Sequence, residues 1–140
     1  MHRTLPKNFI LRGYQTFSDV IKNGQLLQSE SLRCFYKTVR RDAQRNESQK
    51  LPRLRIGFSV PKKNIPLAVH RNRIKRLLRE AFRKNQELFV AVQSGDTDVN
   101  IVVIYRKNIV KDRPAVQLHT IETEWIHLAQ ILVERIRDEQ

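Results

Sequence analysis

The sequence has little of several residue types, and each shortage excludes a class of protein. Cys34 is the only cysteine among 140 residues, so an internal disulfide is impossible and a reducing compartment is suitable. No apolar run approaches the roughly 20 residues that a membrane-spanning helix needs. The basic N-terminus also lacks the apolar stretch of a secretory signal. These shortages predict a cytoplasmic protein that does not enter a membrane.

Residues that carry catalytic chemistry are scattered. The four glycines are too far apart to form a phosphate-binding loop. Asp96 and Asp98 fall in a turn-forming cluster, and Glu122 and Glu124 are two residues apart, so on a helix they point in different directions. None of the histidines has the spacing of a metal site: His2, His70, His119 and His127. We therefore expect neither a catalytic site nor a cofactor held by the protein itself.

Acidic residues are scarce in the middle of the chain, where basic residues are concentrated. Residues 51–84 hold eleven Lys/Arg and one acid, Glu80, a net charge of +10. Residues 1–50 hold ten Lys/Arg and four Asp/Glu, a net charge of +6, whereas residues 85–140 hold six Lys/Arg and nine Asp/Glu, a net charge of −3. A solubilising charge would be spread more evenly. This local excess predicts a polyanionic partner.

The spacing of apolar residues predicts one α+β domain with helices packed on a small mixed sheet. The expected order is helix, strand, strand, helix, strand, helix. The expected ranges are 14–23, 32–40, 53–60, about 64–85, 99–106 and 120–138. Asn64 is expected to cap the fourth element, and the polar segment 40–53 to form a hairpin loop.

The fourth element, rich in basic residues, has two distinct faces. At 100° per residue, its apolar side chains Ile74, Leu77, Leu78, Ala81 and Phe82 fall within an arc of about 140°. The other arc holds Asn72, Arg73, Lys75, Arg76, Arg79, Glu80, Arg83 and Lys84, with Arg71 at its edge. Like charges four residues apart repel, so helix stability does not explain this pattern. Either the face is simply solvated, or it binds phosphates, and Lys62 and Lys63 extend it.

The sequence motifs of this region indicate a protein family more specifically than its charge does. The segment "RIGFSVPKKNIPLAVHRNRIKRLLREAFR" (55–83) closely resembles the signature of the bacterial ribonuclease P protein subunit. That signature is a glycine-containing strand, a Lys-Lys pair, and then Arg-Asn-Arg-x-Lys-Arg on a helix. The resemblance extends over most of the chain, through residues 5–24, 99–108 and 123–136.

The resemblance implies a non-catalytic protein that assists a catalytic RNA. In that family the RNA removes the 5′ leader from precursor tRNA with Mg²⁺, and the protein binds both the RNA and the leader. The implied partners are therefore ribonuclease P RNA and precursor tRNA, with no DNA and no membrane. The implied fold is α-β-β-α-β-α, with an uncommon left-handed crossover around the basic helix.

The resemblance also implies which residues contact RNA. Phe17 matches a family aromatic, Ile21 stands where many members have a second one, and either Phe35 or Tyr36 faces a cleft between the sheet and the first helix. The residues implied to contact the catalytic RNA are Arg71, Asn72, Arg73, Lys75, Arg76, Arg79 and Arg83. Those implied near the leader are Phe17, Ile21, Phe35, Tyr36, Lys62 and Lys63.

Three other functions compete with this one. A general RNA-binding protein, such as a ribosomal protein or RNA chaperone, would use the same basic face but show no preference for a leader. A DNA-binding domain fits the charge, but a strand precedes the basic helix where a helix-turn-helix needs another helix. An independent hydrolase ranks last, because the carboxylates do not cluster.

Overall fold

The computed structural model describes residues 10–11, 13–40, 54–93, 97–108 and 116–139. One four-stranded sheet, in the order β1-β2-β4-β3, forms the centre of the fold. Its strands are β1 (Gln25–Gln28), β2 (Leu32–Arg40), β3 (Leu54–Ser59) and β4 (Thr97–Tyr105). The helices are α1 (Tyr14–Asn23), α2 (Ala68–Lys84), the 3-10 turn η2 (Gln86–Phe89), the short α3 (Val90–Gln93) and α4 (Leu118–Glu139).

The α+β class and the order of the six long elements are confirmed, and the three short elements β1, η2 and α3 are additional. Strand β1 was not expected, because it is four residues long and only Leu27 in it is buried. The basic helix ends at Lys84, and the chain continues as η2 and α3 rather than as one longer helix.

The pairing of the strands corrects one expectation. Strand β4 lies between β2 and β3, antiparallel to β2 and parallel to β3. Residues 41–53 lie outside the described part, but they connect strands that are not neighbours, so segment 40–53 is not a hairpin loop. The hairpin is formed by β1 and β2 instead. Helix α2 belongs to the crossover between the parallel strands β3 and β4, and the left hand of this crossover stays a prediction.

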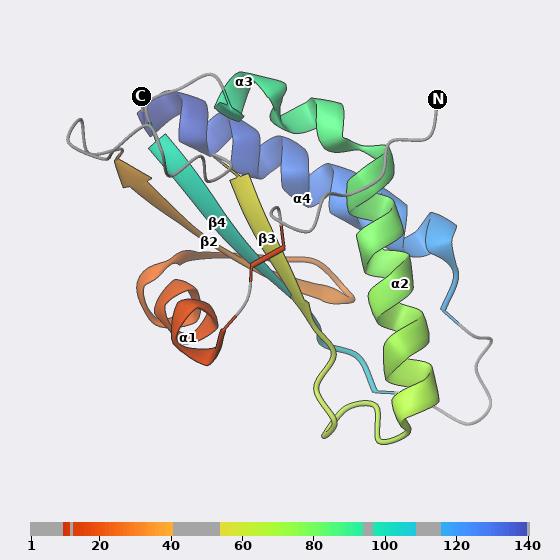
Figure 1. Ribbon diagram of the computed structural model, residues 1–140. Helices are drawn as coiled ribbons and strands as arrows, with labels where there is room; N and C mark the ends of the chain where they lie inside the picture. The colour runs from red at the N-terminus through yellow and green to blue at the C-terminus, as the bar shows by residue number, and fades with distance from the viewer. Residues whose placement is uncertain (1–9, 12, 41–53, 94–96, 109–115, 140) are drawn as a thin grey trace.

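The two faces of the sheet are covered unequally (Figure 1). Helices α2 and α4 pack on one face, where alternate residues of every strand join the main hydrophobic core. That core includes a cluster of rings in which Phe82 of α2, Phe89 of η2 and Trp125 of α4 lie with centroids 5.8 to 6.1 Å apart. Among the described residues, helix α1 and Leu11 cover part of the opposite face, in a small second cluster of Leu11, Val20 and Val102. These residues enclose the second face only partly.

Helix α2 begins later than expected. It starts at Ala68, its N-cap is Leu67, and no side chain caps it. Asn64 instead donates from Nδ2 to the carbonyl of Tyr105, 3.4 Å away. Pro66 explains the delay, because a proline disfavours helical geometry in the residue before it. Asp98, expected in a turn, lies in strand β4.

Candidate nucleic-acid interface

Helix α2 is fastened to the core by four buried side chains, Ile74, Leu78, Ala81 and Phe82. Leu77, expected among them, is only half-buried. On the helical wheel it lies at the edge of the apolar arc, on the same side as Lys84, which reaches toward α4. The faces of the helix are therefore placed as expected, with Leu78 rather than Leu77 at the centre of the buried stripe.

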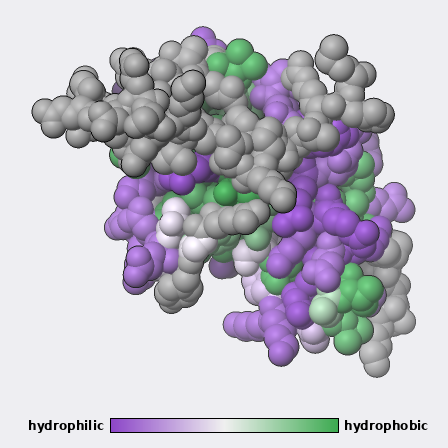
Figure 2. Space-filling view, viewed as in Figure 1, coloured by the Kyte–Doolittle hydropathy of each residue, from purple (hydrophilic) through white to green (hydrophobic). Residues whose placement is uncertain are grey.

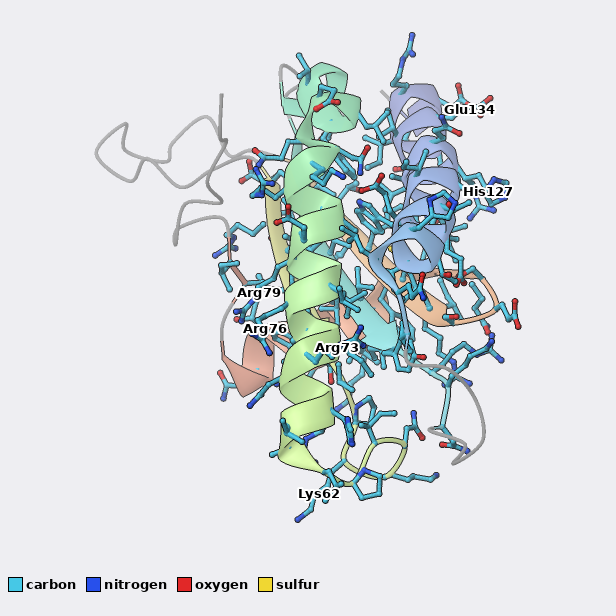
Figure 3. The ribbon with its side chains drawn as sticks, turned by 90° about the vertical axis from the view of Figure 1, so that its right-hand side faces the viewer. Lys62, Arg73, Arg76, Arg79, His127 and Glu134 are labelled. Carbon is cyan, nitrogen blue, oxygen red and sulfur yellow. The ribbon has the colours of Figure 1, made fainter. Side chains whose placement is uncertain are left out.

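The opposite side of α2 forms a surface that we call the basic ridge, made of Arg73, Lys75, Arg76 and Arg79. Figure 3 shows Arg76 and Arg79 on the side of α2 that faces α1, whereas His127 and Glu134 lie on the α4 side. Among the described residues, no carboxylate pairs with Arg73, Arg76 or Arg79. These guanidinium groups are thus available to an external anion.

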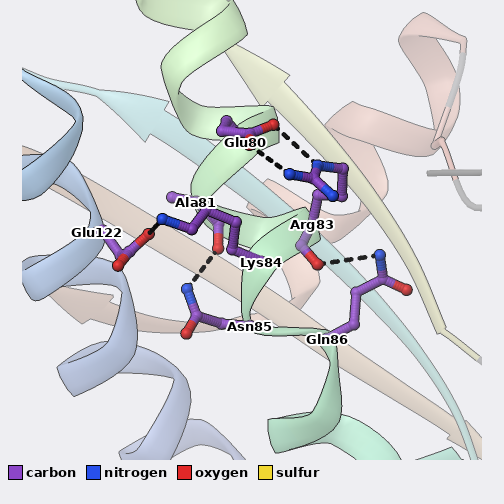
Figure 4. Close-up of polar contacts among 7 residues, drawn as sticks. All are labelled: Glu80, Ala81, Arg83, Lys84, Asn85, Gln86 and Glu122. Carbon is purple, nitrogen blue, oxygen red and sulfur yellow. Dashed lines mark hydrogen bonds and ion pairs between the residues drawn. The ribbon is translucent and has the colours of Figure 1, made fainter. Parts of the chain in front are cut away.

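Three other basic side chains of α2 are engaged within the protein, and Figure 4 shows the contacts of Arg83 and Lys84. Glu80 accepts two hydrogen bonds from Arg83, from Nε at 2.9 Å and Nη2 at 2.5 Å, and the bond to Glu80 raises the pKa of Arg83. Lys84 pairs with Glu122 of α4 at 3.4 Å. Arg71 donates from Nη1 to the carbonyls of Ile65 and Pro66, at 3.0 and 2.6 Å.

Arg71 is thus hydrogen-bonded within the protein, and its expected contact with RNA stays a prediction. Its position on the helical wheel is close to that of buried Leu78, so its guanidinium turns back onto the segment before α2. Asn72 is exposed on the helix, and Lys62 and Lys63 are exposed in the turn that precedes it. Figure 3 shows Lys62 beyond the first turn of α2, at the end of the ridge.

The partly covered side of the sheet forms a second surface, which we call the α1 face. The strand register places its residues in three rows across β2, β4 and β3. The rows are Lys37–Asn100–Arg55, Phe35–Val102–Gly57 and Arg33–Ile104–Ser59. Figure 2 shows weakly polar and hydrophobic surface here, between the hydrophilic surface over α1 and that over α2. The strand register places an apolar row between two rows that carry cations.

Phe17 of α1 packs directly on the middle row. A Cβ atom built on Gly57 would lie 2.3 Å from Cζ of Phe17, so only glycine leaves space for the ring as it lies. Phe17 is half-buried, and Ile21, one turn further along α1, is 37% exposed. Both side chains expected on α1 therefore retain surface that a ligand can reach.

The strand β2 separates the two aromatic candidates. Tyr36 is 1% exposed in the main core, and its hydroxyl donates to Oε1 of Gln25 at 2.7 Å. Phe35 lies on the other side, half-buried beside Val102. Because the side chains of a strand alternate, one residue decides which ring can meet a ligand. Phe35 is thus the ring that lies on the α1 face, and its contact with a leader stays a prediction.

The α1 face also holds basic residues that were not singled out from the sequence. Lys37 pairs with Asp19 of α1 at 2.7 Å, and the Lys37 bond, with one from Asn23, lowers the pKa of Asp19. Arg55 donates from Nε to Oδ1 of Asn100 at 3.3 Å. The alternation of side chains along each strand predicts which residues share a face with Lys37 in β2 and with Arg55 in β3. The sequence alone does not show that the two strands belong to one sheet with both cations on the same face.

Among the described residues, no three His, Cys, Asp or Glu side chains gather where they could hold a metal ion. The thiol of Cys34 is fully buried, and desolvation raises its pKa to about 12, so it stays protonated. Within the same residues, no helix is both long and apolar enough to cross a membrane.

Similar proteins identify the family of this chain. The sequence profile of the ribonuclease P family matches residues 5–130. The chain belongs to the ribonuclease P protein family. The ribonuclease P protein component of Chlorobium phaeobacteroides is 35% identical over 108 residues, covering 73% of this chain and 71% of that protein. The one from Nitrosococcus oceani is 30% identical, covering 81% and 82%.

Solved structures of the ribonuclease P family share the fold. The ribonuclease P protein of Thermotoga maritima, in a complex with 1-(4-fluorophenyl)-2-thiourea, has a TM-score of 0.63 and is 27% identical, covering 86% of this chain and 96% of that one. The protein of Staphylococcus aureus gives a TM-score of 0.60 at 23% identity. Family membership makes the chain a component of an endoribonuclease that contains RNA and processes tRNA.

Proposed function

We propose that this chain is the non-catalytic subunit of a cytoplasmic ribonuclease P, binding the catalytic RNA through the basic ridge and the 5′ leader of precursor tRNA on the α1 face. The RNA would carry the cleavage, with Mg²⁺ bound by the RNA. The observation that carries the proposal is the set of Arg73, Arg76 and Arg79 on a helix whose other side is fixed in the core. Arg76 and Arg79 are exposed, Arg73 is partly exposed, and none of the three pairs with a carboxylate among the described residues.

The ridge suits the backbone of a structured RNA. Its arginines project from a helix that is packed on the core, so binding phosphates does not require the backbone to become ordered. The planar guanidinium binds two phosphate oxygens at once, and each neutralised phosphate releases counterions. Arg76 and Arg79 face the α1 side, so an RNA on the ridge would lie close to the α1 face.

The α1 face suits a single strand. The rings of Phe17 and Phe35 supply apolar surface on which unpaired bases can stack, at about 1 to 3 kcal/mol per base. Cations flank this row, Arg33 on one side and Arg55 on the other, where the strand's phosphates would pass. Ile21 would contribute apolar contact without stacking. A general RNA-binding protein would not need this second surface.

The test compares a precursor tRNA that carries a leader with the same tRNA without one. Both are bound to the assembled protein–RNA complex, prepared with the native chain or with Phe35→Ala. We expect the leader to strengthen binding for the native chain, and Phe35→Ala to remove several-fold of that gain. The variant should bind leaderless tRNA as the native chain does. Equal binding of the two substrates by the native complex would favour the general RNA-binding protein.

A further inference from the structure

An exposed apolar patch lies at the start of α2. Leu67 is 61% exposed and Val69 is 66% exposed, and Pro66 and Ala68 beside them are exposed as well. We call these residues, 66–69, the apolar patch. Figure 2 shows hydrophobic surface at the lower end of α2, beside the hydrophilic surface of the rest of the helix. Exposure of this apolar surface to water is unfavourable in free energy, and an exposed apolar patch often indicates a binding site.

The patch is held in a fixed position. Ile65, directly before the patch, is fully buried. Arg71, two residues after the patch, donates to the carbonyls of Ile65 and Pro66. The backbone N–H groups of His70 and Arg71 both donate to the carbonyl of Leu67, which begins the helix. A ligand would therefore contact Leu67 and Val69 without rearrangement of the backbone that carries them.

Val69 is in line with the basic ridge. Arg73 and Arg76 follow it by four and seven residues, the spacing that places side chains on one stripe of a helix. At 1.5 Å per residue, Val69 and Arg76 are about 10 Å apart along the axis. A partner that lies along the ridge and reaches its lower end must cover Val69.

The surroundings decide the chemistry of that partner. Lys62 and Lys63 are exposed in the turn before the patch, and Arg73 lies one helical turn after it. From residue 54 to residue 79 the chain has no Asp or Glu. A phosphate backbone alone would dehydrate Leu67 and Val69 without replacing the water by apolar contact. An unpaired nucleotide offers both parts, an apolar ring face and an anionic phosphate.

We infer that the apolar patch receives the face of an unpaired nucleobase in the RNA that lies on the basic ridge. The inference rests on the proposed function and makes it more specific. The ridge binds phosphates of any sequence, whereas the patch requires a position in the RNA where a base is free of its stack. It would thus fix where along the RNA the helix is placed.

The test uses the double substitution Leu67→Ser with Val69→Ser, and Val90→Ser as a matched control. Val90 is also a highly exposed apolar residue, at 60%, but it lies in α3, beyond the other end of α2 (Figure 1). Binding to a bacterial ribonuclease P RNA is measured over a series of salt concentrations, with thermal unfolding to verify the fold. Arg73→Ala serves as the reference for loss of a phosphate contact.

We expect the double substitution to weaken binding about tenfold, equivalent to about 1.4 kcal/mol of lost apolar contact. The slope of log K against log salt should not change, because no charge is removed. A fully paired RNA duplex should bind the double variant and the native chain equally. Base-specific chemical probing should show one nucleotide that the native chain protects and the double variant exposes.

Two outcomes would overturn the inference alone, and a third would overturn the proposed function as well. If the double variant binds like Val90→Ser while Arg73→Ala binds weakly, the ridge stands and the patch has no RNA contact. If the native chain binds vesicles of anionic phospholipid and the double variant loses only that binding, the patch serves a lipid surface. If neither Arg73→Ala nor the double variant weakens RNA binding, the proposed function itself fails.

Discussion

The ring of Phe17 lies over Gly57, so closely that a Cβ atom on Gly57 would fall 2.3 Å from its Cζ atom. Gly57 thus supplies the space through which α1 approaches the sheet. The backbone of Gly57 has no positive φ, so the requirement for glycine here comes from the ring and not from the backbone conformation.

This contact makes Gly57→Ala a test of the α1 face. We expect it to reduce the free energy of unfolding by about 1 to 3 kcal/mol, the usual cost of overfilling a packed site, as the ring is displaced. In a Phe17→Ala background the same change should cost little, because no ring is left to displace. Urea unfolding of the four chains measures this coupling, and equal costs in both backgrounds would contradict the contact.

The basic ridge should contribute affinity but little stability. Arg73→Ala and Arg76→Ala should each weaken binding to ribonuclease P RNA and reduce the salt slope by about one. The free energy of unfolding should stay within about 0.5 kcal/mol of the native value, because both side chains are at the surface. Leu78→Ala, in the buried stripe, should cost about 2 to 5 kcal/mol. A comparable loss for either arginine would show that the faces of α2 are misplaced.

Arg71 should behave differently from these two arginines. It holds the carbonyls of Ile65 and Pro66, so Arg71→Ala should reduce the free energy of unfolding by about 1 to 2 kcal/mol. Arg71→Lys keeps the charge but not the paired donation, so it should lose much of the same stability. Thermal or urea unfolding of both variants tests this. A fully stable Arg71→Lys would show that charge, and not hydrogen bonding, is what the site needs.

The pair of Asp19 and Lys37 predicts a specific response to acid. The hydrogen bonds from Lys37, and next from Asn23, lower the pKa of Asp19 below its ordinary 3.8. The pair therefore stabilises the fold above about pH 4, and its contribution is lost as the pH falls through the lowered pKa. An NMR titration of the Asp19 carboxyl should give a value below 3.8, and Lys37→Ala should move it upward. A value unchanged by Lys37→Ala would mean that the ion pair does not form in solution.

The sequence predicted the six long elements and the two faces of α2, because each depends on a local period of apolar residues. Strand β2 had the expected bounds, and the main helices differed by a few residues. The same alternation placed Phe35 and Tyr36 on opposite sides of β2, but it could not tell which side the first helix covers. That choice depends on Phe17 meeting Gly57, a contact between residues 40 positions apart.

The pairings that the sequence did not predict are long-range as well. Strand β4 separates β2 from β3, so the loop between them is not a hairpin. The bonds of Arg71 to the carbonyls before α2 depend on where the helix begins, which Pro66 delays to Ala68. Composition identified the basic ridge, whereas Lys37 and Arg55 on the α1 face required the strand register.

The most direct measurement is single-turnover cleavage of a precursor tRNA with a 5′ leader at low Mg²⁺. Three mixtures are compared: the protein alone, a bacterial ribonuclease P RNA alone, and the two together. We predict rapid cleavage at the mature 5′ end by the pair, slow cleavage by the RNA alone and none by the protein alone. A pair that cleaves no faster than the RNA, although the protein binds it, would contradict the proposed subunit role.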